Sequence, residues 1–291
     1  MALIVVTLTW GLIRLAPGNF YISDKKLPPA VEANIRKKYG LDLPWYQQYG
    51  MMMSNIIRGD FGDSLKYQGR SVNDIIREHL PYSAAIGILG YILALAIGLT
   101  AGTIAALKQN SAFDYGSMSL AMLGLSVPNF VLGPILVLIF SFWLHWFPPA
   151  RWDGVVGIVL PVCTLAAIYS AYIARLTRAG MLEVMRSDYI RTARAKGLDE
   201  KTVLLRHAIR GGLIPVVSFT GPALAALLAG TVVVEKVFAI PGLGNMFINS
   251  VLNRDEPLTL GIVAFLSILI MVFNLIVDIS YGFLDPRIRY D

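Results

Sequence analysis

The distribution of charge along the chain constrains its fold more than any other feature. Long stretches contain no Asp, Glu, Lys or Arg, and charged stretches separate them. Charged residues make up 15% of the chain, against about 25% in a soluble domain. The hydrocarbon core of a bilayer is about 30 Å thick, so a helix needs roughly 20 apolar residues to cross it. Because most of the charge-free stretches are that long, the pattern predicts an all-α integral membrane protein.

Six transmembrane helices are predicted from these stretches. They cover residues 1–16, 79–107, 115–146, 154–174, 211–234 and 257–277, and the last is expected to continue to residue 283. The first is short for a span, and we expect a basic leader to precede it. Pro128 and Pro134 interrupt the third span. Gly98 and Gly102, in the second, have the small-xxx-small spacing that lets two helices pack closely.

Residues 17–79 form a charged segment between the first two spans. We expect short helices in it, one from about Pro44 to Gly59 and another that begins near Val72 and continues into the second span. Residues 59–64, which read Gly-Asp-Phe-Gly-Asp-Ser, are predicted to form a tight turn.

The loop of residues 175–210 predicts the orientation of the chain. It holds nine Lys or Arg residues against four Asp or Glu residues. Lys and Arg concentrate on the cytoplasmic side of membrane proteins. The loop and the C-terminus are therefore predicted to be cytoplasmic, and residues 17–79, 147–153 and 235–256 external. The net charge of +6 indicates this orientation rather than a nucleic-acid partner.

The sequence lacks the motifs of the common catalytic and cofactor sites. It has no G-x-x-x-x-G-K-[ST] phosphate loop and no H-E-x-x-H metal motif. Its three histidines, at positions 79, 145 and 207, fall in different segments, and Cys163 is its single cysteine. We therefore predict no enzyme activity, no bound cofactor and no metal site for this chain.

A short helix is predicted within the basic loop. Residues 189–196 suit a helix that Asp188 would cap and Gly197 would end. Such a helix is too short to be stable alone, so it needs a surface to pack on. The candidate docking residues are Asp188, Tyr189, Arg191, Thr192, Ala193, Arg194, Ala195, Lys196 and Gly197. The alternative is a solvated basic loop that contacts only lipid phosphates.

Polar residues within the predicted spans are candidates for lining a pathway. They are Asn129, Ser218, Thr220, Asn274 and Asp278. Asp278 is the one acidic residue inside a predicted span, and charges at membrane depth usually mark functional sites. The alternative places Asp278 at the inner interface, near Arg287 or Arg289. The uncharged candidates would then join helices by hydrogen bonds.

The sequence of the basic loop resembles that of a known family. Residues 191–198 read R-T-A-R-A-K-G-L, and residues 206–208 read R-H-A. This spacing is similar to the cytoplasmic EAA loop of the permeases of binding-protein-dependent ABC importers. It is most similar to the B-type subunit of the oligopeptide and dipeptide branch. The loop departs from the general pattern, because Arg191 stands at the glutamate position, Thr192 at the first alanine, and the terminal proline is displaced to Pro215.

Further segments resemble the same branch in the same order along the chain. They are residues 14–18, 59–62, 126–130, 238–244 and 278–290. The resemblance implies a type I importer core over residues 82–283 and a coupling helix at 188–198 that docks on an ATPase.

The resemblance also implies the partners and the mechanism. The partners are a second homologous permease, two ATP-binding subunits that carry ATP and Mg²⁺, an extracytoplasmic peptide-binding protein and the lipid of a bacterial or archaeal plasma membrane. The mechanism it implies is alternating access, driven by ATP on the partner subunits.

Three functions stay open at this point. The first is a permease for oligopeptides or dipeptides. The second is a permease of the same branch for nickel or another small solute. The third is a secondary transporter or channel without ATPase partners; the nearly charge-free centres of the spans count against it.

Overall fold

The computed structural model describes residues 1–15, 40 and 42–284, which are predominantly helical, with one isolated β-bridge between Asp63 and Ser71. The helices in chain order are α1 (Ala2–Leu15), α3 (Trp45–Ile57), α4 (Val72–Leu107), α5 (Ala112–Ser126), α6 (Asn129–Leu136), the π-helix η1 (Val137–Trp143), α7 (Gly154–Met185), α8 (Asp188–Ala195), α9 (Glu200–Thr202), the π-helix η2 (Val203–Ala208), α10 (Ile209–Gly212), α11 (Ile214–Val237), α12 (Leu243–Leu252) and α13 (Glu256–Leu284). Arg287 and Arg289 lie outside the described residues.

The chain divides into two compact units. The first consists of Met1–Tyr82 and Pro241–Met271, and the second of Ser83–Ile240 and Val272–Asp291. The first unit contains α1, α3 and α12, and the second contains α5 to α11. The predicted helices near Pro44 and from Val72 are present as α3 and α4.

Three described helices are long and apolar enough to cross a bilayer: α4, α7 and the Glu256–Ile276 part of α13. The pair formed by α5 and α6–η1 meets the same test when it is taken as one span. Shorter apolar helices occur at Ala2–Leu15 and at Ile214–Leu224, the first part of α11. A helix or helix pair therefore lies at each of the six predicted positions.

The third predicted span is bent more sharply than an interrupted helix would be. Its two halves, Ala112–Ser126 and Asn129–Trp143, lie at 107° to each other. The break falls at Val127 and Pro128, which both have extended backbone. A proline disfavours helical backbone in the residue before it, so α5 has to end there. Pro134 lies inside α6 and precedes the π-helix η1, so the second interruption changes the helix type rather than breaking the chain.

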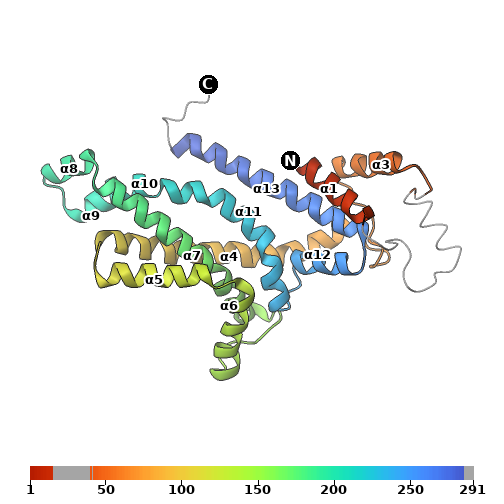
Figure 1. The fold of residues 1–291 in the computed structure, drawn as a ribbon, viewed down its shortest axis with the longest axis horizontal. Helices are drawn as coiled ribbons and strands as arrows, with labels where there is room; N and C mark the ends of the chain where they lie inside the picture. Colours follow the sequence, from red (N-terminus) through yellow and green to blue (C-terminus); the bar gives the residue numbers. More distant parts are fainter. Residues whose placement is uncertain (16–39, 41, 285–291) are drawn as a thin grey trace. The chain divides into compact units, whose positions relative to one another are not determined.

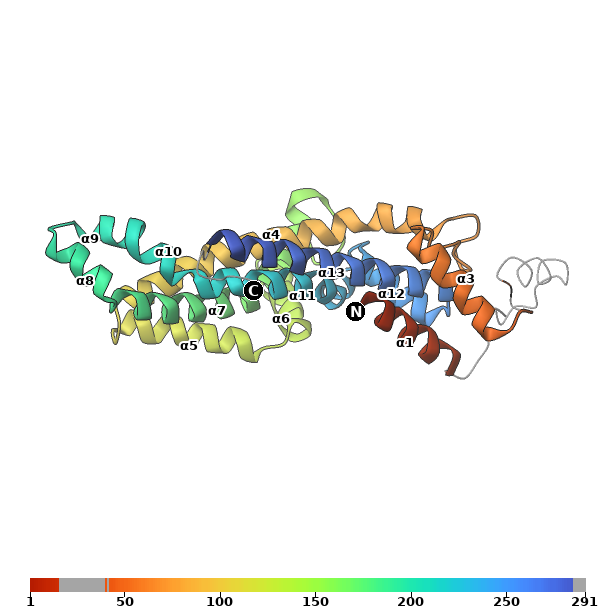
Figure 2. The ribbon, with the colours of Figure 1, turned by 90° about the horizontal axis from the view of Figure 1, so that it is seen from above.

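Close packing on α7 organises the second unit. A Cβ atom at Gly98 would lie 2.6 Å from the side chain of Ile173, and one at Gly102 would lie 2.5 Å from the carbonyl oxygen of Ala174. The predicted close approach at these two glycines is confirmed, and α7 is the helix that α4 approaches. On another side α5 runs beside α7 (Figures 1 and 2).

The first unit has its own apolar core and a buried carboxylate. The core is formed by Val72, Ile75, Ile76, Leu243, Leu258 and Ile262. Asp255 is buried and accepts hydrogen bonds from the Ser64 hydroxyl and from the backbone N–H groups of Leu65 and Lys66. These bonds satisfy a carboxylate that would be costly to bury alone, and they hold the loop after the predicted 59–64 turn against the start of α13.

Replacing Gly102 by alanine should destabilise the protein by about 1–3 kcal/mol, because the new methyl group would press on the backbone of α7. Gly116→Ala is the matched control: Gly116 lies inside α5, and apart from its own stretch of helix nothing described lies within 4 Å of a Cβ built there. Thermal unfolding of the purified protein in detergent measures the stability of both variants. Equal midpoints for the two variants would contradict the packing described.

Candidate functional site

The predicted helix in the basic loop exists as α8, and its boundaries differ slightly from those expected. The helix runs from Asp188 to Ala195, and Gly197 follows with φ of +81°. Gly197 therefore ends the helix in the left-handed conformation that suits glycine. The prediction that Asp188 caps the helix was wrong. Ser187 has the extended backbone of the N-cap position, and Asp188 is the first helical residue, where its charge favours the helix dipole.

One face of α8 packs on the protein itself. Ile190 is 0% exposed and Ala193 is 6% exposed. They belong to a cluster, here called the α8 cluster, of Ala106, Met181, Ile190, Ala193, Val203 and Ala208. The surface that stabilises this short helix is therefore supplied by the ends of α4, α7 and η2. The alternative of a solvated loop is wrong for this segment.

The position of Ala193 corrects its predicted role. Its side chain is buried in the α8 cluster, so it cannot touch another protein directly. The helical period places Ile190 and Ala193 on one face, and sequence alone did not reveal which face the chain would cover.

The rest of the α8 surface is polar, basic and exposed: Arg191 and Thr192 lie away from the buried pair, and Lys196 follows at the C-cap. Tyr189, at the flank, is 50% exposed, and its hydroxyl lies beside Gly211 of α10. Arg191 forms an ion pair with Asp188 at 3.3 Å. This face combines an aromatic ring with cationic groups, a composition that suits contact with another protein.

After α8, the rest of the loop folds back on α7 through α9, η2 and α10. Arg194 donates two hydrogen bonds to Glu200, at 2.7 and 3.2 Å, and so joins α8 to α9. Asp199 caps α9 by accepting from the N–H and the hydroxyl of Thr202, and these bonds lower the pKa of the Asp199 carboxyl. At Gly180 a Cβ atom would lie 2.3 Å from the carbonyl oxygen of Gly212, so α10 lies directly on α7.

The five candidates for a pathway do not form one group. Thr220 accepts a hydrogen bond from the Tyr91 hydroxyl at 2.7 Å, which joins α4 to α11. Ser218 donates to the carbonyl of Ile214 within its own helix. Thr220 therefore fits the alternative reading, in which polar side chains join helices, whereas the Ser218 bond stays within α11.

The other three candidates lie on α6 and α13. The amide oxygen of Asn129 is buried and has no hydrogen-bond partner among the described residues. Asn274 is exposed on α13. Asp278 lies in the same helix, and its side chain is outside the described part of the structure. Within the described side chains, no hydrogen bond joins any two of the five.

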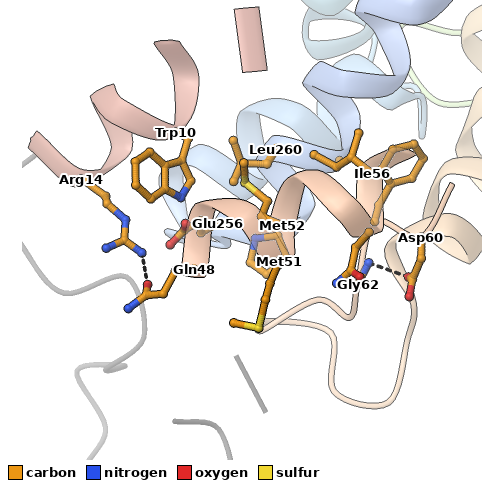
Figure 3. Close-up of a pocket in the computed structure, with 14 residues that line it drawn as sticks. Trp10, Arg14, Gln48, Met51, Met52, Ile56, Asp60, Gly62, Glu256 and Leu260 are labelled. Carbon is orange, nitrogen blue, oxygen red and sulfur yellow. Dashed lines mark hydrogen bonds between the residues drawn. The ribbon is translucent and has the colours of Figure 1, made fainter. Parts of the chain in front are cut away.

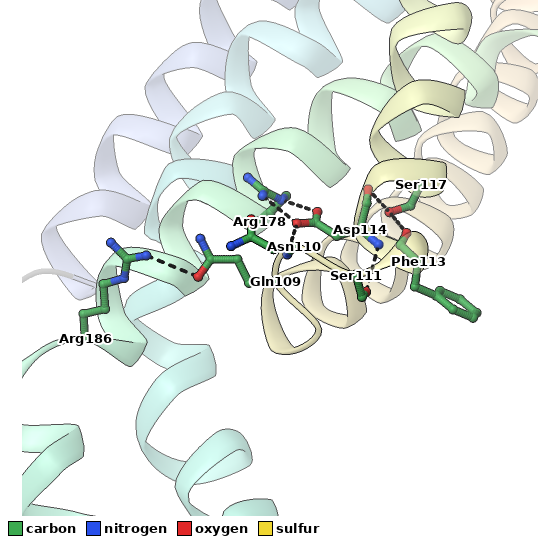
Figure 4. A network of polar contacts seen from close by, with 8 residues as sticks. All are labelled: Gln109, Asn110, Ser111, Phe113, Asp114, Ser117, Arg178 and Arg186. Carbon is green, nitrogen blue, oxygen red and sulfur yellow. Dashed lines mark hydrogen bonds and ion pairs between the residues drawn. The ribbon is translucent and has the colours of Figure 1, made fainter.

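Sequence reasoning missed an ion pair near α8. Arg178 of α7 donates to both carboxylate oxygens of Asp114, at 2.5 and 2.7 Å (Figure 4). Asp114 is 1% exposed and lies in the first turn of α5. The spacing Ser111-x-x-Asp114 is a helix-start signal that the sequence contained, but nothing in it indicated Arg178 as the partner.

The first unit contains a pocket that sequence reasoning also missed (Figure 3). Its volume is about 150 Å³, and its lining combines apolar side chains such as Trp10, Met52 and Leu260 with polar ones. Arg14 lies over the Trp10 ring at 4.5 Å and donates to Gln48. The lining comes from α1, α3, residues 60–62 and the start of α13, and it places one cation, Arg14, and two carboxylates, Asp60 and Glu256, beside apolar surface.

The fold defines the class of the protein. Over 72% of its length the chain superposes on 96% of a chain from inward-facing conformations of the MetNI methionine ABC transporter, with a TM-score of 0.63 and 16% identity. A chain from an amino acid ABC transporter with histidines gives a TM-score of 0.52 and 19% identity, over 72% of this chain and 93% of that one. The protein has the fold of a type I ABC importer permease.

The sequence comparison gives the family. Residues 98–290 match the family described as binding-protein-dependent transport system inner membrane component, and the chain belongs to that family. The oligopeptide transport system permease protein OppB of Haemophilus influenzae is 46% identical over 99% of this chain and 94% of its own length. OppB of Escherichia coli K12 is 44% identical over the same shares. The dipeptide transport system permease protein DppB of Bacillus subtilis is 42% identical over 99% of this chain and 93% of its own length.

Family membership removes one of the three functions left open by the sequence. A secondary transporter or channel is not supported, because the family consists of inner membrane components of binding-protein-dependent systems. The protein is therefore a multi-pass membrane subunit of a transport system.

Gly197→Val should loosen the C-terminal end of α8, because a β-branched residue at φ of +81° is strained by roughly 1–2 kcal/mol. Gly197→Asn is the matched control, since asparagine tolerates this conformation. Apart from the adjacent residues, nothing described lies within 4 Å of a Cβ built at Gly197, so the comparison isolates backbone strain. Amide hydrogen exchange across residues 188–195 should be about tenfold faster in the valine variant than in the asparagine variant. Equal rates would contradict the role of Gly197.

Proposed function

We propose that the chain is a permease subunit of an ATP-driven importer, and that it forms part of the translocation pathway for oligopeptides or dipeptides. The family and the fold support the first part of this proposal. The names of the relatives, which are 42–46% identical over 99% of the chain, support the second.

The observation that carries the proposal is the construction of α8. Its apolar face is anchored on the ends of α4, α7 and η2, and its polar face is exposed. A helix held in this way is a rigid projection that a partner can move without first having to fold it. We propose that α8 docks on an ATP-binding subunit. Tyr189, Arg191, Thr192 and Lys196 would make the contact, and Ile190 and Ala193 would hold the helix in place.

The proposal assigns ATP and Mg²⁺ to the partners. The sequence contains no phosphate loop, so hydrolysis belongs to two ATP-binding subunits. A second homologous permease would complete the pathway, and an extracytoplasmic binding protein would deliver the substrate. ATP-driven closure of the two ATPase subunits would move α8, and α7 would carry this movement to the spans, as alternating access requires.

Reconstitution with the partner subunits tests the transported substrate. Proteoliposomes that contain the full complex and its binding protein should take up short peptides, and peptides should stimulate ATP hydrolysis. The control is the same complex with Ni²⁺ in place of peptide. Stimulation by Ni²⁺ and not by peptides would contradict the peptide proposal and support the nickel alternative.

The proposed orientation places α8 in the cytoplasm and α12 outside. The excess of nine basic over four acidic residues in 175–210 supports it. Reporter fusions after Ser187 should therefore show cytoplasmic activity, and fusions after Asn249 external activity. An external signal at Ser187 would overturn the orientation and the docking role of α8 together.

A further inference from the structure

The ion pair between Asp114 and Arg178 has the geometry of a strong tie between two helices. The guanidinium binds both carboxylate oxygens through Nε and Nη2, at 2.5 and 2.7 Å. Such two-point contact fixes direction as well as distance. The carboxylate is buried, whereas about a quarter of the arginine side chain is exposed. A buried carboxylate that loses its partner is strongly destabilised, so the two helices are held together at this point.

Asp114 also organises the turn between α4 and α5. Its second carboxylate oxygen accepts from the backbone N–H of Asn110, and its own N–H donates to the Ser111 hydroxyl. Asn110 has a positive φ of 61°, so the turn adopts a conformation that such contacts help to maintain. These two bonds would be enough to cap the start of α5 even if Arg178 were absent. The ion pair therefore does more than close the turn: it connects the turn to α7.

A second contact joins the same turn to α7. Arg186 Nη2 donates to the side-chain oxygen of Gln109 at 3.2 Å, so residues at and just after the end of α7 contact this region at two positions, 178 and 186 (Figure 4). Arg186 directly follows the end of α7, and α8 begins two residues later. The turn and the base of α8 are thus attached to one helix.

The apolar contacts follow the same route. Ala106, in the last turn of α4, belongs to the α8 cluster together with Met181 of α7 and with Ile190 of α8. Met181 lies three residues after Arg178, one helical turn along α7. The α8 cluster therefore attaches α8 to α7 and α4, and the ion pair attaches α7 to α5.

We propose that Asp114 and Arg178 are positioning residues of energy coupling, which make the α4–α5 turn move with α7 when α8 is displaced. The proposal rests on the proposed docking of α8. Without the pair, α8 could still bind its partner and the partner could still hydrolyse ATP. The displacement would reach α7 and be lost before it moved α5.

The test uses the complete transporter in proteoliposomes with its ATP-binding subunits and binding protein. Asp114→Asn removes the charge and keeps an oxygen for the Asn110 N–H. We expect normal co-purification of the ATP-binding subunits and continued ATP hydrolysis. Peptide uptake per ATP hydrolysed should fall at least about fivefold, the lower end of typical coupling between sites. Glu78→Gln, which breaks the exposed Arg70–Glu78 pair of the first unit, is the matched control and should leave the ratio unchanged.

A second variant covers the case in which Asp114→Asn does not accumulate. Arg178→Lys keeps the charge and loses the two-point fork, so the ratio of uptake to hydrolysis should fall by a smaller factor. An unchanged ratio in a folded Asp114→Asn complex, or in Arg178→Lys if the first variant fails to fold, overturns the proposal. Loss of the ATP-binding subunits from the complex in either variant also overturns it, because the pair would then serve docking. If the unsubstituted chain never binds those subunits, the proposed function fails instead.

Discussion

The structure of the second unit depends on the close approach of other helices to α7. Glycines at positions 98 and 102 bring α4 against it, and the Gly180–Gly212 contact brings α10 against it. At each of the three positions described, an added Cβ atom would lie within 2.6 Å of an atom of the neighbouring helix. Association of helices in a bilayer relies on such packing, because lipid offers no hydrophobic driving force between helices. α7, which these contacts enclose, continues from the apolar region to the base of α8.

This arrangement explains how a short helix can serve as a contact surface. Eight residues are too few to form a stable helix in water. The α8 cluster supplies the missing stability from residues on α4, α7 and η2, and it leaves the basic face free. Because α8 follows α7 after two residues, and α7 is fixed by packing and by the Asp114–Arg178 pair, a force on α8 has a defined path toward the spans.

The sequence predicted the membrane class, because long charge-free stretches are a local property of the chain, and a helix or helix pair lies at each predicted span. It also predicted the ends of α8 to within one residue, because Gly197 ends the helix by its own backbone preference. It did not predict the bend of 107° at Pro128, since proline disrupts a helix without fixing the direction of the chain that follows. It misplaced Ala193, because periodicity shows that two faces exist and not which one is covered. Asp114 and Arg178 are 64 residues apart, so only the packing of α5 on α7 brings them together.

A cross-linking measurement tests the central claim, that the exposed face of α8 contacts an ATP-binding subunit. In a Cys163→Ala background the chain has no other cysteine, so Thr192→Cys can carry a maleimide photo-cross-linker at a single position. Arg58→Cys, exposed in the first unit, is the control. In the active complex, the account predicts an adduct between position 192 and the ATP-binding subunit, with a yield that changes with ATP, and no adduct from position 58. A transport-active complex without an adduct at position 192 would contradict it.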